Sequence, residues 1–191
     1  MKPIIPLLAS VPLAVAWYPG VDKDIFAATG NNIFNSSSNA VGKRYLPDPK
    51  IRGVNLGAHF IFEPWIAENK WKSMGCPTAE KRKSEFDCGS SLGHDQTDKV
   101  FQDHWGSWIT KEDISQMRDY GLITIRIPVG YWLKEDLVDA NSEHFPRGGL
   151  QYLSDVCDWA AEAGMYIVMD FHGLPGAQQA KQPFTGQVCI S

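Results

Sequence analysis

Residues 123–132 read ITIRIPVGYW, and this stretch decides the fold class. Apolar and β-branched residues dominate it, as they do in strands that are covered on both faces of a parallel sheet. Arg126 interrupts the run, and a guanidinium in a core strand is costly unless carboxylates or a polar pocket receive it. Pro128 is expected to end the pairing of the strand. We therefore predict a core strand that delivers a cation to a polar site near its carboxyl end.

The sequence on either side of this strand contributes two further strands. Residues 51–60 (IRGVNLGAHF) are expected to form the first, in which Gly53 and Gly57 permit close backbone approach. Residues 166–171 (YIVMDF) are expected to form the third. A long excursion rich in Trp and Phe, residues 61–109, separates the first strand from the rest.

Two helices are expected between the strands. Thr110 and Asp113 form a box-like start for the first, and Gly121 ends it. The second runs from about Gly149 to Gly164. The apolar stripes recur at helical spacing, with Ile114, Met117 and Tyr120 in the first helix and Leu150, Leu153, Val156, Cys157, Ala160 and Ala161 in the second.

The order strand, helix, strand, helix, strand is typical of parallel α/β proteins with right-handed crossovers. Because no glycine-rich phosphate loop follows a strand, a dinucleotide-binding fold is disfavoured and a (β/α) barrel remains. Barrels place their chemistry at the carboxyl ends of strands. Glu63, Arg126 and His172 follow or end the three expected strands, so we expect them to converge on one face.

A structural role is the alternative for each of these three residues. Arg126 could form a structural salt bridge with Asp170 or another carboxylate, and His172 could be a satisfied core histidine at a turn. Glu63 could be a solvated loop acid. The three together are a stronger indication of a site than any one of them.

The chain has 191 residues, a net charge of −4 and 43% apolar residues, which suits one globular domain or part of a larger one. Neither the charge nor any basic block indicates nucleic acid. Residues 1–16 have the pattern of a secretory signal peptide that is cleaved after Ala16. Since no later segment reaches about 18 consecutive apolar residues, we expect a soluble, secreted, extracellular protein without a membrane span.

Secretion permits disulfides. Cys76 and Cys88 are expected to form a local bridge across a polar loop, with a contribution of about 3 kcal/mol to stability. A zinc site with His94 or His104 is the alternative, although the spacing fits no familiar ligand pattern.

Three further positions have simpler interpretations. Cys157 is expected to be a core residue on the second helix, and Cys189 is left over in the tail. Asn35 begins an Asn-Ser-Ser sequon and is expected to carry an N-glycan.

Several stretches resemble glycoside hydrolase family 5, and within it the secreted fungal β-glucanases. They include IRGVNLG, FEPWIA, SEFDC, YGLITIRIPVGYWLKEDLV and MDFHGLPGAQ, and together they extend from Trp17 to Gln187. The resemblance implies a (β/α)8 TIM barrel that hydrolyses β-glucan with retention of configuration. It favours endo action on β-1,6 linkages, with exo action on β-1,3 linkages as the alternative. It implies no cofactor and no metal, and a monomer if the protein is full length.

The resemblance also implies roles for individual residues. Arg126 matches an arginine that supports the nucleophile carboxylate, and His172 matches a histidine of the substrate subsite. Glu63 matches an acid that binds terminal glucose hydroxyls. Sugar stacking is expected from Trp65, Tyr131 and Trp132, with ordinary core or loop packing as the alternative.

The chain departs from the family pattern in its extent. The family carries its acid/base and nucleophile glutamates on the fourth and seventh strands, and retaining glycosidases need two carboxyls about 5–5.5 Å apart. We expect an irregular extension at 17–50, the N-terminal part of a barrel at 51–187 and a non-family tail at 188–191. The chain by itself is then expected to lack both glutamates, to be inactive and to have unpaired strand edges.

Two other functional classes remain open. The chain could be a non-catalytic glucan-binding fragment that keeps aromatic subsites without the catalytic carboxylates. It could also be an unrelated barrel hydrolase that uses a metal at Asp170 and His172, although no second ligand cluster supports this.

Overall fold

The computed structural model describes residues 16–17, 50–79 and 83–175. The expected signal peptide up to residue 15, the sequon at Asn35, Cys189 and the tail 188–191 lie outside the described residues. The elements in chain order are β1 (Ala16–Trp17), β2 (Gly53–Asn55), α1 (Glu68–Ser73), α2 (Glu85–Leu92), α3 (His94–Trp105), α4 (Lys111–Asp119), β3 (Thr124–Gly130), the 3-10 turns η2 (Tyr131–Leu133) and η3 (Glu135–Leu137), α5 (Gly149–Glu162) and β4 (Tyr166–Gly173).

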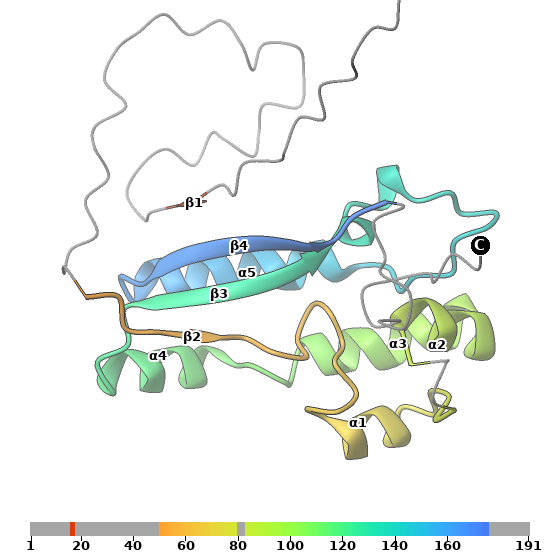
Figure 1. Cartoon of the computed structure of the whole chain (residues 1–191), viewed down its shortest axis with the longest axis horizontal. Helices are drawn as coiled ribbons and strands as arrows, with labels where there is room; N and C mark the ends of the chain where they lie inside the picture. Colours follow the sequence, from red (N-terminus) through yellow and green to blue (C-terminus); the bar gives the residue numbers. More distant parts are fainter. Residues whose placement is uncertain (1–15, 18–49, 80–82, 176–191) are drawn as a thin grey trace, which may run out of the picture.

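The sheet has the strand order β1-β4-β3-β2 (Figure 1). β2 and β4 both pair with β3 in parallel, so that Asn55, Arg126 and Val168 lie side by side in register. α4 connects β2 to β3, and α5 connects β3 to β4. This arrangement confirms the predicted order of three parallel strands and two crossover helices.

The prediction that Pro128 ends the strand is wrong. β3 continues to Gly130, and Pro128 aligns with Asp170 of β4. A proline removes one N–H donor from the ladder but leaves the donors and acceptors of its neighbours in place. Arg126 therefore lies in the first half of β3 rather than at its end.

The expectation of an unpaired edge on the third parallel strand is also wrong for the described residues. β1 runs antiparallel to β4, with Ala16 opposite Val168 and Trp17 opposite Ile167. Sequence periodicity could not show this, because a strand of two residues is too short to display a pattern.

One face of the sheet packs against α4 and α5. Ile125 and Ile127 of β3 are buried there with Ile114, Val156 and Ala160 of the two helices, which confirms most of the predicted stripes. Tyr120 and Leu150 are exceptions, with 75% and 49% of their surface exposed. Tyr120 is the residue that caps the end of α4, and Leu150 lies in the first turn of α5, so neither faces the sheet.

The predicted ends of α4 are confirmed. The Thr110 side chain accepts the Asp113 backbone N–H, and the Asp113 carboxylate accepts the Thr110 N–H at 2.8 Å. Gly121 follows the helix with a φ of +83°, a conformation that glycine adopts without strain. Gly53, the first residue of β2, lies close to the backbone of β3. A Cβ at this position would lie 2.9 Å from the Thr124 carbonyl oxygen, so the predicted close backbone approach is confirmed.

The excursion between β2 and α4 folds into three helices, which lie near the carboxyl ends of the strands (Figure 1). The first residue of its second helix follows Ser84, whose side chain forms a capping box with Asp87. Phe101 and Trp105 of α3 are buried in the main core. Among the described residues, no helix is long and apolar enough to cross a membrane.

The predicted bridge between Cys76 and Cys88 is confirmed. Its environment is not the polar loop that the sequence indicates, because Cys88 lies on α2 and both cysteines are buried in the main core. The bridge therefore joins α2 to the segment after α1 inside the protein. Cys157 is a free cysteine that packs against the same core, as predicted, and burial raises the pKa of its thiol to about 12.

Candidate active site

A row of polar side chains lies on the sheet face opposite the crossover helices. Arg126 is the central residue of this row. Alternate residues of β3 face opposite sides of the sheet, and Ile125 and Ile127 face the helices, so Arg126 faces away from them. The Arg126 guanidinium donates from Nη1 to Asn55 Oδ1 at 2.6 Å and from Nη2 to Asp170 Oδ2 at 2.5 Å. The guanidinium thus joins all three parallel strands.

The salt bridge between Arg126 and Asp170 explains how β3 can carry a cation. Their side chains are 41% and 28% exposed, so the pair keeps contact with solvent while its opposite charges compensate each other. The salt bridge that the sequence left open as an alternative is present. It leaves the charge on the open face of the sheet, where a ligand could reach it.

His172 joins this row through the same carboxylate. Its Nδ1 lies 2.9 Å from Asp170 Oδ2. A carboxylate paired with Arg126 can only accept a hydrogen bond, so we assign a proton to Nδ1 of His172, which donates it to Asp170. Asp170 therefore sets the orientation of His172 and of Arg126 together.

Glu63 lies at the other end of the row, in the loop after β2. Its Oε2 accepts the backbone N–H of Ala58 at 3.0 Å, and Ala58 has a φ of +56°. A Cβ on Gly57 would lie 3.2 Å from Glu63 Oε2 and 3.6 Å from Asn55 Nδ2. The absence of a side chain at Gly57 thus leaves room between the Glu63 carboxylate and the Asn55 amide that binds Arg126.

The three aromatic residues expected to stack on sugars occupy different environments. Trp65 is 60% exposed. Tyr131 and Trp132 are buried together with Phe145, against whose ring Trp132 stacks at 4.4 Å. This burial favours the alternative in which Tyr131 and Trp132 are ordinary core residues. Stacking of their rings on a sugar stays a prediction, because neither ring has an exposed face.

Two histidines are buried near Glu63, His59 in the same loop and His104 on α3. His59 Nε2–H donates to the Trp105 carbonyl at 3.1 Å, and His104 Nε2–H donates to the Ala58 carbonyl at 2.7 Å. Among the described residues, neither Nδ1 atom has a hydrogen-bond partner. Burial lowers the pKa of each imidazole to about 4, so both are neutral near pH 7.

This geometry also bears on the zinc alternative. Cys76 and Cys88 are bonded to each other, and His104 is engaged by the backbone. In the part of the chain that the structure describes, no group of three or more His, Cys, Asp or Glu side chains could hold a metal ion.

A buried carboxyl group completes the environment of the site. Glu85 is fully buried and accepts the Phe62 backbone N–H at 2.7 Å and the Trp132 indole N–H at 2.6 Å. Desolvation raises its pKa to about 8, although both hydrogen bonds act in the opposite direction.

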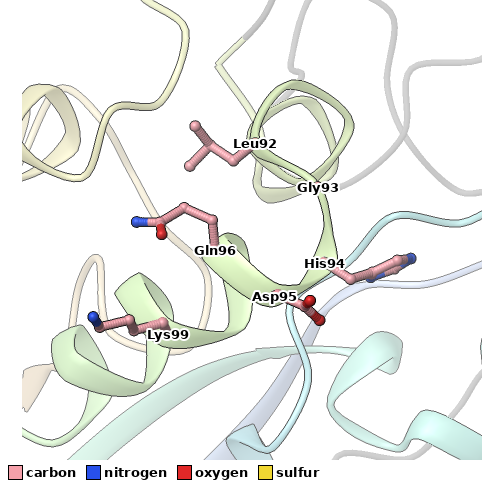
Figure 2. A pocket seen from close by; sticks show the side chains of 6 residues that line it. All are labelled: Leu92, Gly93, His94, Asp95, Gln96 and Lys99. Carbon is pink, nitrogen blue, oxygen red and sulfur yellow. The ribbon is translucent and has the colours of Figure 1, made fainter.

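A shallow hollow of about 570 Å³ lies elsewhere, at the junction of α2 and α3 (Figure 2). Leu92, Gln96 and Lys99 project to one side of it and His94 to the other. No residue of the polar row lines this hollow, so the two are separate.

Sequence reasoning missed Asn55 as a site residue and did not single out Glu85 or His59. It named Asp170 only within alternatives, as a salt-bridge partner of Arg126 or a metal ligand with His172, and His104 only as an alternative zinc ligand. For Asp170 a signal was present, because it lies two residues before His172 and so on the same face of the strand. Asn55 could have been found in the same way once the parallel pairing with Arg126 was fixed. The buried groups gave no such signal, since their partners come from backbone positions far away in the sequence.

Parallel strands joined by crossover helices, with a polar row on the open face of the sheet, are the features of part of a (β/α) barrel enzyme. The sequence profile described as Cellulase (glycosyl hydrolase family 5) matches residues 88–187, and the chain belongs to this family. The predicted family is thereby confirmed.

Curated relatives place the chain more closely within the family. It is 64% identical over 188 residues to glucan endo-1,6-beta-glucosidase B of Emericella nidulans, covering 98% of this chain and 45% of that protein. It is 56% identical over 175 residues to probable glucan endo-1,6-beta-glucosidase B of Aspergillus fumigatus, covering 92% of this chain and 41% of that protein. A probable glucan 1,3-beta-glucosidase A of Aspergillus fumigatus is 38% identical over 128 residues, with 67% of this chain and 29% of that protein covered. The chain therefore spans less than half the length of these relatives.

Solved structures agree with the fold. Rutinosidase from Aspergillus niger superimposes with a TM-score of 0.61 at 27% identity, covering 73% of this chain and 37% of that one. The structure titled AoRut gives a TM-score of 0.57 at 27% identity, covering 66% and 34%. The three parallel strands are the N-terminal part of a (β/α)8 barrel, as predicted.

Proposed function

We propose that the intact protein hydrolyses β-glucan by endo action on β-1,6 linkages. The observation that carries the proposal is the row of Arg126, Asp170 and His172 on the open face of the sheet. His172 lies near the carboxyl end of β4, the end at which barrel enzymes keep their catalytic groups. The 64% identity to a glucan endo-1,6-beta-glucosidase supports the choice of linkage.

The proposed mechanism is a retaining double displacement, with one carboxyl as acid/base and another as nucleophile. We assign these two roles to glutamates on later strands of the barrel, as the family pattern implies. Arg126 would face the nucleophile and hold it ionised by opposite charge. Asp170 keeps the guanidinium in place through Nη2 and leaves other donors of the fork for a further carboxylate.

His172 and Glu63 are assigned to substrate binding. The imidazole of His172 is held in place by the contact of its Nδ1 with Asp170, and we assign it to a hydrogen bond with a sugar hydroxyl. Glu63 retains acceptor capacity beyond its bond to Ala58, and Trp65 offers an exposed ring near it. A hydroxyl acceptor beside an aromatic face is an arrangement that suits a glucose unit.

Secretion and glycosylation belong to the same proposal. We assign residues 1–16 to a signal peptide, an N-glycan to Asn35 and a monomeric state to the full-length protein. N-terminal sequencing of the exported protein is expected to begin at Trp17, and a retained residue 1 would contradict the assignment.

Exo action on β-1,3-glucan is the second candidate, because a probable glucan 1,3-beta-glucosidase is also similar to this chain. The two are separated by incubating the intact protein with pustulan, a β-1,6-glucan, and with laminarin, a β-1,3-glucan. We expect oligosaccharides of several lengths from pustulan and little release from laminarin. Glucose as the sole early product of laminarin would support exo action instead. Binding to pustulan without release of sugar would support a non-catalytic glucan-binding protein.

The role of Arg126 is tested in the same assay. Arg126→Ala is expected to lower turnover by about 10²-fold or more, because a preorganised cation at a reacting centre is worth several kcal/mol. Arg118→Ala, on the exposed surface of α4, is the matched control and is expected to keep full turnover. Wild-type turnover in Arg126→Ala would reject the role.

A further inference from the structure

Glu85 connects two loops that leave neighbouring strands of the sheet. Its Oε1 accepts the backbone N–H of Phe62, in the loop after β2. Its Oε2 accepts the indole N–H of Trp132, in the turn η2 that directly follows β3. Phe62 is adjacent to Glu63. One buried carboxyl group therefore binds both the backbone beside Glu63 and the turn after β3.

The helix that carries Glu85 is itself held firmly. Its N-cap Ser84 is part of a capping box, and Cys88 is bonded to Cys76 in the core. Gly89 packs so closely that a Cβ there would lie 1.7 Å from the His144 carbonyl oxygen. Because α2 is fixed at these three points, Glu85 can transmit its position to the two loops.

The chemistry of the contact requires acceptor oxygens. Both groups that meet Glu85 are N–H donors, and the oxygens of a carboxyl group accept hydrogen bonds, both of them when the group is ionised. An amide at the same position would turn its NH₂ toward one of the donors. Alanine would leave both donors buried without an acceptor, at a cost comparable to the loss of two hydrogen bonds.

We propose that Glu85 is a positioning residue that clasps the loop after β2 to the turn after β3 and thereby holds Glu63 and Trp65 against the substrate. This inference rests on the proposed function, because it takes β-glucan as the ligand of that loop. Glu85 does not touch the substrate itself, since it is fully buried. Its effect is therefore expected on substrate binding rather than on the chemical step.

Other titratable groups around the clasp have contacts of their own. They are Asp87, which accepts from Ser84, His104, whose ring packs on Phe62, Glu143, which accepts from Tyr131, and His144, whose ring packs on Phe86. None of them is among the causes that shift the pKa of Glu85, which are its burial and its two hydrogen bonds.

The first measurement follows the indole N–H signal of Trp132 in the intact protein. ¹⁵N-labelled tryptophan gives one indole N–H signal for each Trp, and Trp132→Phe identifies the signal of Trp132. We expect this signal to shift with pH as Glu85 titrates, and to stay constant over the same pH range in Glu85→Gln. A Trp132 indole signal with the same chemical shift in Glu85→Gln as in the wild type from pH 5 to pH 9 would overturn the clasp.

The second measurement tests the link to substrate with pustulan as the probe. Glu85→Gln is expected to raise KM about tenfold and to change kcat by less than about threefold, which is the signature of lost binding rather than lost chemistry. Glu112→Gln, on the exposed surface of α4, is the matched control and is expected to leave both unchanged. Hydrolysis with the wild-type KM in Glu85→Gln overturns the inference and leaves the proposed function standing. Absence of hydrolysis by the wild type overturns the proposed function, and with it the substrate-facing part of the inference.

Discussion

Acidification is expected to destabilise this protein through His59 and His104. Each imidazole is buried with its Nε2–H donated to a carbonyl, and its Nδ1 has no acceptor among the described residues. A second proton would have to sit on Nδ1 in an apolar environment. The folded state therefore keeps both rings neutral down to a pKa of about 4, whereas the ordinary value is 6.5.

The magnitude follows from proton linkage. Between pH 6.5 and pH 4 the unfolded chain binds a proton at each histidine and the folded chain does not, so the free energy of unfolding falls as the pH falls. Each histidine contributes about 1.4 kcal/mol per pH unit, which amounts to about 3 kcal/mol over the interval. The two rings lie close together, so their contributions are coupled and about 3 to 6 kcal/mol is expected in total, a large fraction of the stability of a domain.

Glu85 has the opposite sign. Its pKa rises from 4.5 to about 8 on folding, so the folded state holds a proton that the unfolded state has lost, and stability falls as the pH rises through this window. Up to pH 6.5 the two histidines change the free energy of unfolding more per pH unit than the one carboxyl group does, so stability rises with pH. From pH 6.5 to about pH 8 only the carboxyl group contributes and stability falls, so maximum stability is expected near pH 6.5.

Urea unfolding of the intact protein at half-unit steps from pH 4.5 to pH 8.5 checks this profile. His104→Gln is expected to reduce the slope on the acid side, and Glu85→Gln is expected to remove the decline on the alkaline side. His144→Gln is a control histidine that is less buried. A midpoint that is constant from pH 4.5 to pH 6.5, or that rises on acidification, would refute the reasoning.

Three further outcomes are expected. Asp170→Asn keeps the shape of the side chain but removes the charge that orients Arg126, and pustulan turnover by the intact protein should fall by about 10²-fold; an unchanged rate would contradict the positioning of the guanidinium. Gly89→Ala places a Cβ 1.7 Å from the His144 carbonyl oxygen, so calorimetry should show a loss of about 3 kcal/mol or more, and a wild-type melting temperature would exclude the close contact. Replacement of Cys76 and Cys88 together by Ala should cost about 3 kcal/mol in urea unfolding, and peptide mapping of the wild type that finds two free thiols would refute the bridge.

The predictable part of the fold depends on local patterns. The capping box of Thr110 and Asp113 and the terminating Gly121 are contained in a few consecutive residues. The apolar run around Ile125 likewise indicates a strand that packs against helices on one face. Such features depend on short-range sterics and hydrogen bonds, so the sequence reveals them directly.

The unpredicted part depends on contacts between distant segments. The carboxylate of Glu85 meets Phe62 and Trp132 through packing of the whole excursion, and neither partner is marked by periodicity. In the candidate site, Arg126 and His172 were identified by sequence, but Asp170 was named only as a salt-bridge partner of Arg126 or as a metal ligand with His172. Its shared carboxylate becomes visible only when the register of β3 and β4 is known. The burial of Trp132 has the same cause, because its indole is covered by Phe145 from a later loop.

The burial of the bridge between Cys76 and Cys88 determines how the protein responds to reductants. Thiol–disulfide exchange requires an attacking thiolate to reach one of the two sulfurs, and both cysteines are enclosed in the core. Reduction therefore has to wait for an opening of the core around α2. The rate at which glutathione breaks the bond then measures the rate of that opening and stops rising with glutathione concentration once opening is limiting. Oxidation has the same restriction in reverse, so the two thiols must meet before the core closes over them.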